Sequence, residues 1–339
     1  MHRDEFSLIR ALARPWKTQP PPLGPGDDAA VLPMVDRLVV STDGAQEGVH
    51  FRRTWPISCS DHGFRVLANA LSDILAMGAR PFSVQIQVIQ GTDWTDEDLI
   101  AVMEGMADLA QSWSLSLCGG DVIRGPGPTA IVCTVLGTLE RGRTPWLRSA
   151  AHVGDVLAVT GNTGLAALGL SILEMNHPVT DNLLAKSALR GFTNPALPRQ
   201  EWKILRELRE RVAAIDISDG LHGDLRHLAR ASTVQARVDI EELPSPPGFD
   251  DLAHELGIEP KELLCHGGET CQLAVALAPE TFERALEAGA SLTPIGFCGP
   301  FSSTEPVLFL DAAGIPVELG GTSWMHMHHD EDDPSGAIR

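Results

Sequence analysis

The feature that most limits the fold is an alternation, along the whole chain, of short runs with strand periodicity and longer runs with helical periodicity. Residues 61–77 repeat apolar side chains at helical spacing. Residues 83–89 instead alternate Val84, Ile86 and Val88 with polar neighbours, the pattern of a strand with one buried face. Alternating strands and helices are typical of proteins in which helices cover a sheet, so we expect an α/β (α+β) fold.

The same periodicities place the other elements and divide the chain. We expect helices at residues 4–13, 61–77, 96–113, 165–175, 198–211 and 221–230. We expect strands at residues 38–42, 83–89, 129–139, 156–160, 213–217, 272–277, 293–298 and 307–310. A polar stretch at 141–153 separates the halves, so we expect domains at 1–145 and 146–325. Residues 326–339, rich in histidine and acidic residues, are expected to form a flexible tail.

Charge and cysteine usage exclude several classes of protein. Asp and Glu number 45 against 26 Lys and Arg, a net charge of −19, which disfavours nucleic acid and anionic membranes as partners. The longest uncharged run, residues 156–173, is interrupted by a polar Thr-Gly-Asn-Thr-Gly stretch, so we expect no membrane span. The first residues do not read as a signal peptide, and the six scattered cysteines form no Cys-x-x-Cys pair. We therefore expect a cytoplasmic protein with reduced, buried thiols.

The common nucleotide-binding loops are absent. Gly24-Pro-Gly26 and Gly125-Pro-Gly127 begin sequences that match the dinucleotide fingerprint by letter. The first follows a proline-rich loop and the second leads into a strand, whereas the fingerprint needs a strand before it and a helix after it. No lysine follows a glycine, so there is no Walker motif either. Any ATP site must therefore be built from other residues.

Short carboxylate clusters stand out instead, most of them beside glycine. They are Gly26-Asp27-Asp28, Ser41-Thr42-Asp43-Gly44, Leu71-Ser72-Asp73, Gly119-Gly120-Asp121 and Asp216-Ile217-Ser218-Asp219-Gly220. Oxygen-only donor sets favour magnesium over zinc. Each cluster also has a structural interpretation, because Asp-Gly and Gly-Asp are common in turns. On that interpretation Asp219 only caps a helix, and Asp73, opposite Phe64 on its helix, faces solvent. Asp43 and Asp121 each end an apolar strand-like run beside a glycine, which favours them as magnesium ligands.

The order of these clusters resembles a known family. GPGDDAAVLP, VVSTDGAQEGVHF, ANALSDILAMGARP, CGGDVIRGP, LRSAAHVGDVLAVTG, IDISDGLHGDL and HGGET are similar to the successive motifs of the thiamine-monophosphate kinase family, within the superfamily of aminoimidazole ribonucleotide synthetase. The resemblance extends from about residue 6 to about residue 324. It implies a two-domain fold with a ferredoxin-like N-terminal domain that forms a dimer barrel and a C-terminal α/β domain that completes the active site. Buried edge strands such as 83–89 would suit such a homodimer.

The resemblance also implies an activity and its residues. The family transfers a phosphoryl group from ATP to thiamine monophosphate, using several Mg²⁺ ions. Its metal positions fall on Asp27, Ser41, Thr42, Asp43, Asp73, Asp121, Asp216 and Asp219, of which Asp43, Asp73, Asp121 and Asp219 are the expected catalytic residues. Its nucleotide positions fall on Trp113, Gly120, Asp121, Arg148 and Ser218. Its substrate positions fall on His50, Glu269 and Trp324. Trp113 could equally be a core residue at the end of its helix.

Two motifs depart from the family and keep alternatives open. The usual GGEDYEL is replaced by GGETCQL at residues 267–273, and Arg-Pro-x-Pro-Arg is reduced to NPALPR at 194–199. We expect the family's carboxylate at position 270 to orient Glu269 or a substrate amine without binding metal. Thr270→Asp should then lower the KM for thiamine monophosphate modestly and leave the KM for ATP unchanged. The alternatives are a superfamily member that acts on a different acceptor and a nucleotide-binding paralogue without turnover. Selenophosphate synthetase is disfavoured because only Lys17 precedes Asp27.

Overall fold

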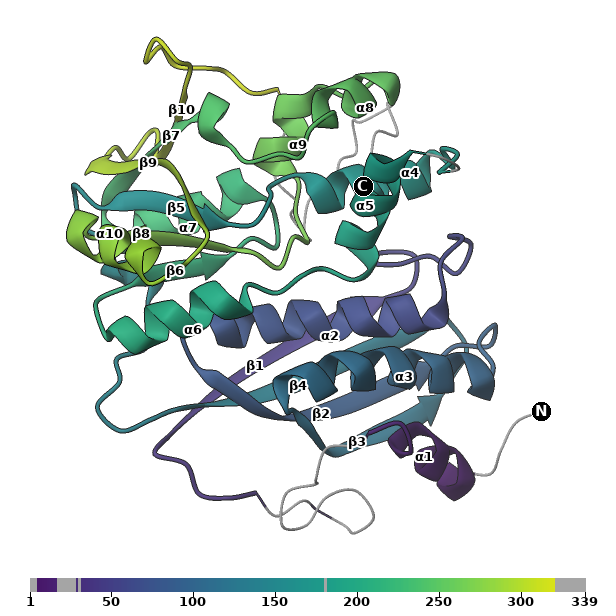
Figure 1. Cartoon of the computed structure of the whole chain (residues 1–339). Helices are drawn as coiled ribbons and strands as arrows, with labels where there is room; N and C mark the ends of the chain where they lie inside the picture. The colour runs from purple at the N-terminus through teal and green to yellow at the C-terminus, as the bar shows by residue number, and fades with distance from the viewer. Residues whose placement is uncertain (1–4, 17–28, 30–31, 180–181, 321–339) are drawn as a thin grey trace. The chain divides into compact units, whose positions relative to one another are not determined.

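The computed structural model describes residues 5–16, 29, 32–179 and 182–320 (Figure 1). The chain forms two compact units, Met1–Pro145 and Trp146–Arg339. No helix among the described residues is long and apolar enough to cross a membrane. All six cysteines are free, and Cys59 alone is not fully buried.

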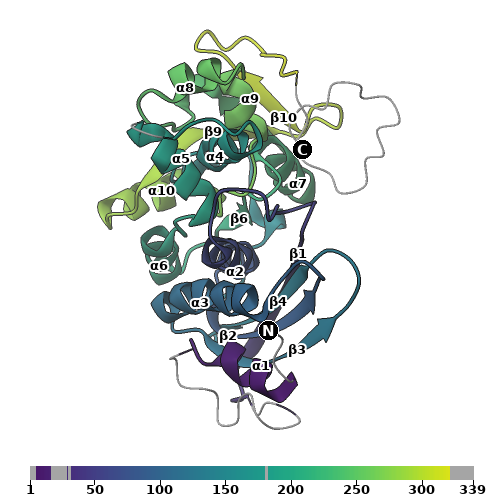
Figure 2. The ribbon, with the colours of Figure 1, turned by 90° about the vertical axis from the view of Figure 1, so that its right-hand side faces the viewer.

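The first unit is built on a four-stranded sheet. Its elements are α1 (Glu5–Ala13), β1 (Arg37–Gln46), α2 (Cys59–Ala76), β2 (Arg80–Gln90), α3 (Asp96–Trp113), β3 (Ser116–Arg124) and β4 (Ala130–Leu139). The strand order is β1-β4-β2-β3, with β2 and β3 parallel and the other pairs antiparallel. Figure 2 shows α2 and α3 on the same face of this sheet. The opposite face carries exposed apolar side chains, including Leu38, Val40 and Ile89.

The two long helices of this unit begin at capping boxes. The Ser58 hydroxyl accepts the backbone N–H of Asp61, whose carboxylate accepts the backbone N–H of Ser58 in return. Thr95 and Asp98 repeat the arrangement at α3. Each box satisfies two backbone donors that a helix N-terminus otherwise leaves unpaired. The Ser58 cap explains why α2 starts at Cys59, two residues before the position predicted from periodicity.

The prediction that residues 83–89 form an edge strand is wrong. β2 lies between β4 and β3, and β1 and β3 are the outer strands of the described sheet. Alternation reports which face of a strand is buried but not whether a neighbour pairs on each side, so the pattern could not decide this point.

The second unit is built on a six-stranded sheet with the order β10-β7-β9-β5-β8-β6. Its strands are β5 (Val156–Thr160), β6 (Ala213–Asp216), β7 (Val234–Asp239), β8 (Leu273–Leu277), β9 (Leu292–Pro300) and β10 (Val307–Leu310). Its helices are η1 (Arg148–Ala150), α4 (Leu165–Glu174), α5 (Leu183–Thr193), α6 (Arg199–Leu208), α7 (Leu221–Ser232), η2 (Ile240–Glu242), α8 (Phe249–Glu255), α9 (Pro260–His266) and α10 (Pro279–Glu287). One core joins the sheet to the helices, with Ile215, Leu225 and Ile295 among its fully buried members.

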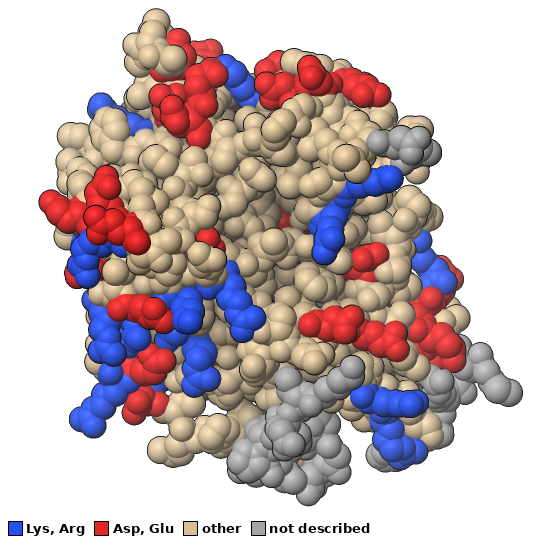
Figure 3. Space-filling view, in the orientation of Figure 1, with Lys and Arg blue, Asp and Glu red and all other residues tan. Residues whose placement is uncertain are grey.

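Acidic and basic side chains are interspersed on the face of the molecule drawn in Figure 3. No broad basic surface of the kind that binds nucleic acid is visible on that face.

Candidate functional site

In the first unit, a hydrogen bond joins two of the predicted site residues. Ser41 on β1 donates its hydroxyl to the Asp73 carboxylate on α2, with 2.6 Å between Oγ and Oδ2. Asp73 is therefore half-buried against the sheet, and the prediction from helical periodicity that it faces solvent is wrong. No ion pair to Asp73 is formed within the described part of the chain. A half-buried carboxylate without a counter-charge is suited to bind a cation.

Asp43 lies two residues after Ser41 and so shares its face of β1. Asp43 does not end its strand, because β1 continues to Gln46. Thr42 points to the opposite face, where its hydroxyl lies 3.0 Å from that of Thr134. The side chains of Ser41, Asp43 and Asp73 therefore share one side of β1, and that of Thr42 lies on the other.

Asp121 lies on another strand of the same sheet. The prediction that it ends a strand is wrong, since β3 continues to Arg124. The pairing register aligns Asp43, Cys133, Ile86 and Gly120 in one row across the four strands. At the usual spacing between strands, Asp43 is roughly 14 Å from Gly120 at the other end of that row, and Asp121 follows Gly120 in the chain. Magnesium–oxygen bonds are about 2 Å long, so Asp43 and Asp121 of one unit cannot bind the same ion.

His50 follows β1 in a tight turn. Its Nδ1 accepts the backbone N–H of Gln46 at 3.1 Å, and the guanidinium of buried Arg65 donates to its carbonyl oxygen. An imidazole whose Nδ1 accepts a hydrogen bond carries its proton on Nε2 when neutral. The turn therefore holds His50 as a hydrogen-bond donor through Nε2, as contact with a phosphate or carbonyl oxygen requires.

Trp113 is the last residue of α3 and is 7% exposed. This burial agrees with its interpretation as a core residue. A contact with the nucleotide stays a prediction.

In the second unit, the loop after β6 carries three predicted residues. Asp216 ends the strand and is buried, Ser218 is exposed, and Asp219 is half-buried. The predicted alternative that Asp219 merely caps the next helix is wrong, because the N-cap of α7 is Gly220 and no side chain caps it. Gly220 has a φ of 115°, and a Cβ there would lie 2.3 Å from the carbonyl oxygen of His266. Only glycine fits this position.

Asp224 was missed by the sequence analysis although it holds this loop. From the first turn of α7 its Oδ2 accepts the backbone N–H of Ser218 at 3.0 Å and that of Asp219 at 3.2 Å. The side chain is buried, and burial, followed by the charges of Asp216 and Asp219, raises the pKa of Asp224 to about 8. The available signal was its place in the first turn of a helix that follows an acidic loop.

A second segment supports the same loop from the other side. The backbone N–H groups of Glu269 and Thr270 donate to the carbonyl oxygens of Ser218 and Ile217. Glu269 and Cys271 have positive φ values of 56° and 53°, uncommon for residues other than glycine and frequent at functional sites. Thr270 is buried, and its hydroxyl donates to the Ile217 carbonyl at 3.0 Å. Thr270 therefore supports the loop after β6 and forms no hydrogen bond to the Glu269 side chain among the contacts described.

Arg148 begins η1 and is exposed. Its carbonyl oxygen accepts the Ser232 hydroxyl at 2.6 Å, and the same hydroxyl accepts the backbone N–H of Ala151. Ser232 thus fixes the backbone of Arg148 and leaves its guanidinium exposed. Asp27 and Trp324 lie outside the described residues.

The oxygen donors fit magnesium in type and in number. Within the described ranges, no three Asp, Glu, His or Cys side chains converge as a metal-binding group. Protein-only cages need such a group, but magnesium in phosphoryl-transfer enzymes is usually bound by one or two carboxylates together with substrate phosphates and water. The residues around Ser41 and around Asp216 have the composition expected of such partial sites.

Comparison with known proteins shows the family to which the chain belongs. Family models of AIR synthase related proteins match in two parts, the N-terminal domain at residues 26–139 and the C-terminal domain at residues 152–292. Thiamine-monophosphate kinase of Bacillus subtilis is 31% identical over 326 residues, which cover 94% of this chain and 98% of the relative. The chain belongs to the thiamine-monophosphate kinase family. The predicted family and its mixed α/β fold of two domains are thereby confirmed.

Solved structures agree with this assignment. Thiamine-monophosphate kinase from Stenotrophomonas maltophilia has a TM-score of 0.75 and 29% identity, over 91% of this chain and 97% of that one. The AaThiL structure complexed with AMPPCP and TMP has a TM-score of 0.73 and 25% identity, over 85% of this chain and 87% of that one.

Proposed function

We propose that this chain transfers the γ-phosphoryl group of ATP to the phosphate of thiamine monophosphate, giving thiamine diphosphate and ADP. The names of its relatives and the ligands of the AaThiL complex support this reaction. In this chain the main structural support for the reaction is the half-buried Asp73 carboxylate. It is hydrogen-bonded to Ser41, which lies on the same face of β1 as Asp43. Negative oxygen donors of this kind bind the magnesium ions that accompany phosphate groups.

Two groups of residues would hold magnesium ions. One is Ser41, Asp43 and Asp73 in the first unit, and the other is Asp216 and Asp219 in the second. Bound magnesium neutralises the phosphates of both substrates and the charge that develops on the transferred group. Asp121 lies too far from Asp43 to share its ion, which supports the use of more than one ion.

The chain's own residues position the reactants. The acceptor oxygen belongs to a phosphate that is ionised at neutral pH, so no general base is needed. Positioning and electrostatic stabilisation therefore supply most of the rate. His50 offers its Nε2 proton to an oxygen of the acceptor, and Arg148 offers an exposed guanidinium to the nucleotide.

A homodimer and a cytoplasmic location belong to the same proposal. The sheet face opposite α2 and α3 exposes Leu38, Val40, Ile89 and Ile123, at 55%, 53%, 38% and 45%. An apolar sheet face of this kind is suited to pack against a second copy. Free thiols on all six cysteines fit a reducing compartment.

Product analysis tests the reaction directly. The protein is incubated with ATP, magnesium and thiamine monophosphate, and nucleotides and thiamine phosphates are separated by chromatography. We expect thiamine diphosphate and ADP in equal amounts, and neither product when EDTA is added. ATP binding without thiamine diphosphate would instead support a different acceptor, an alternative that the GGET departure at residues 267–270 favours.

A further inference from the structure

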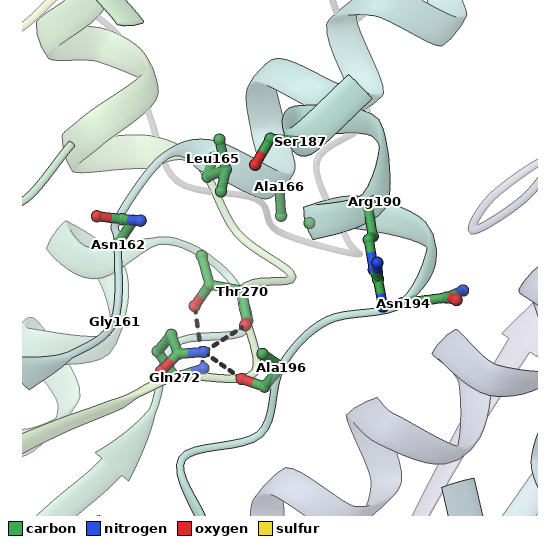
Figure 4. Close-up of a pocket in the computed structure, with 11 residues that line it drawn as sticks. Gly161, Asn162, Leu165, Ala166, Ser187, Arg190, Asn194, Ala196, Thr270 and Gln272 are labelled. Carbon is green, nitrogen blue, oxygen red and sulfur yellow. Dashed lines mark hydrogen bonds between the residues drawn. The ribbon is translucent and has the colours of Figure 1, made fainter. Parts of the chain in front are cut away.

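The departures from the family motifs meet in one pocket. A cavity of about 250 Å³ in the second unit is lined by the turn between β5 and α4, by α5 and the loop after it, and by the segment that leads into β8. Thr270, Gln272 and Asn194 all line it (Figure 4). Positions 270 and 272 carry carboxylates in the GGEDYEL motif, and Asn194 begins the segment NPALPR that stands where the family has Arg-Pro-x-Pro-Arg. Changes that are far apart in the sequence thus alter one site.

The walls of the pocket are fixed by neutral hydrogen bonds. The Gln272 side-chain oxygen accepts the Thr160 hydroxyl at 2.8 Å, and its nitrogen donates to the carbonyl oxygen of Ala196. The Thr270 hydroxyl donates to the carbonyl oxygen of Ile217. A Cβ at Gly161 would lie 2.6 Å from the Gln272 oxygen, so the turn packs directly on this amide. The pocket is therefore preformed, and its floor carries no charge.

Among the described residues that line the pocket, Arg190 alone has a charged side chain. It lies one helical turn before Asn194, and Figure 4 shows both on the same side of the cavity. The structure gives its guanidinium no hydrogen bond or ion pair to any described residue. Ser187, on the preceding turn of α5, adds a hydroxyl. Guanidinium groups next to hydroxyl and amide donors bind carboxylates and phosphates in preference to amines.

We propose that this pocket is a binding subsite for an anionic oxygen group of a small molecule, a carboxylate or a phosphate, held by Arg190 with Ser187 and Asn194. Thr270, which lines the pocket, follows Glu269 in the chain, so the group belongs either to the acceptor substrate or to a separate small anion that binds beside it. The assignment to the acceptor rests on the proposed kinase function. The proposal that the pocket binds an anion does not rest on that function, because it depends only on the charge and hydrogen-bonding groups of the lining residues.

Thermal unfolding with inorganic phosphate tests the subsite without turnover. The full chain is titrated in the absence of magnesium and nucleotide, at constant ionic strength set with sodium chloride, as wild type, Arg190→Gln and Lys186→Gln. Lys186 is the matched control because it is exposed on α5 but does not line the pocket. We expect phosphate to raise the Tm of wild type and of Lys186→Gln alike. In Arg190→Gln the apparent Kd should rise at least tenfold.

Repeating the titration with saturating thiamine monophosphate identifies the source of the group. If the anionic group belongs to the acceptor, phosphate no longer raises the Tm once thiamine monophosphate is bound. Arg190→Gln then raises the KM for thiamine monophosphate but not for ATP. If it belongs to a separate anion, the response persists. A wild type without a phosphate response, or one equal to that of Arg190→Gln, overturns the proposal. A chain that fails to phosphorylate thiamine monophosphate but keeps an Arg190-dependent response retains the subsite and loses only the kinase assignment.

Discussion

Ser41 and Asp73 are 32 residues apart in the sequence, yet the hydroxyl of one lies 2.6 Å from the carboxylate of the other. The bond fixes α2 against β1 at the point where Asp43 shares the same face. A hydroxyl that donates to a carboxylate leaves the remaining carboxylate lone pairs free to accept a cation. This contact makes Asp73 the first residue to test.

We expect Asp73→Asn to lower kcat by at least two orders of magnitude and to leave the fold intact. The amide keeps the size of the side chain and an oxygen that accepts the Ser41 hydroxyl, and it removes the charge proposed to bind magnesium. Steady-state kinetics over a range of magnesium concentrations, with urea unfolding alongside, checks both parts. Asp108→Asn, at an exposed position of α3, is the control and should match wild type. Normal turnover of Asp73→Asn at ordinary magnesium would remove Asp73 from the site.

Asp224→Asn should slow phosphoryl transfer by about 10- to 100-fold, the usual cost of losing a group that orients metal ligands. In assays at pH 9, where Asp224 is ionised, asparagine offers a weaker acceptor than the carboxylate to the amides of Ser218 and Asp219, so the loop is held less firmly. We expect higher magnesium and ATP requirements and an unchanged KM for thiamine monophosphate. Asp251→Asn, at an exposed position of α8, is the control. Equal changes in both KM values would indicate general loss of structure instead.

The sequence predicted the segments of the site better than their environments. Periodicity located α2 and β1, but it placed Asp73 in solvent because it takes no account of a partner on another element. The strand before Asp121 was predicted to end too early because Gly119-Gly120-Asp121 is typical of a turn, whereas pairing with β2 keeps β3 extended to Arg124. Asp224 could not be predicted, because its role depends on how α7 packs beside the loop before it.

For Thr270→Asp, the motif comparison and the structure predict opposite outcomes. The motif comparison predicts that Thr270→Asp restores a family carboxylate and improves acceptor binding. The structure predicts that a carboxylate at this buried position faces the Ile217 carbonyl without a proton to donate. We expect a loss of about 1–3 kcal/mol of unfolding free energy and no decrease in the KM for thiamine monophosphate. Urea unfolding and saturation kinetics check these outcomes, and Thr270→Ser, which keeps the hydroxyl, should stay near wild type.

Trp113→Ala should destabilise the chain by about 3–5 kcal/mol, because it removes a large side chain that is 7% exposed. Trp113→Phe fills more of the same space and should cost less. Chemical unfolding of both variants measures these differences, and the KM for ATP is determined on the folded fraction. A raised KM for ATP in a variant of normal stability would favour a nucleotide contact over the core interpretation.

His62 gives the first unit a stability that depends on pH. It is 2% exposed and its ring lies 5.1 Å from that of Phe51 and 6.3 Å from those of Trp55 and Trp94. Burial, reinforced by the positive charge of Arg65, lowers its pKa from 6.5 to about 4. The folded state therefore holds His62 neutral at pH values where the unfolded chain binds a proton. Its contribution is fully present above the unfolded pKa and is lost as the pH falls from about 6.5 to about 4.

A variant without an ionisable group at this position separates this effect from other acid-labile contacts. Between pH 7.5 and pH 5 the wild type should lose about 2 kcal/mol more unfolding free energy than His62→Gln, because only the wild type has a histidine to protonate on unfolding. Urea unfolding at both pH values measures the two slopes. The comparison does not require equal stability at pH 7.5, since the glutamine can change packing among the surrounding rings without introducing a dependence on pH. Parallel slopes for the two proteins would show that His62 has an ordinary pKa in the folded state.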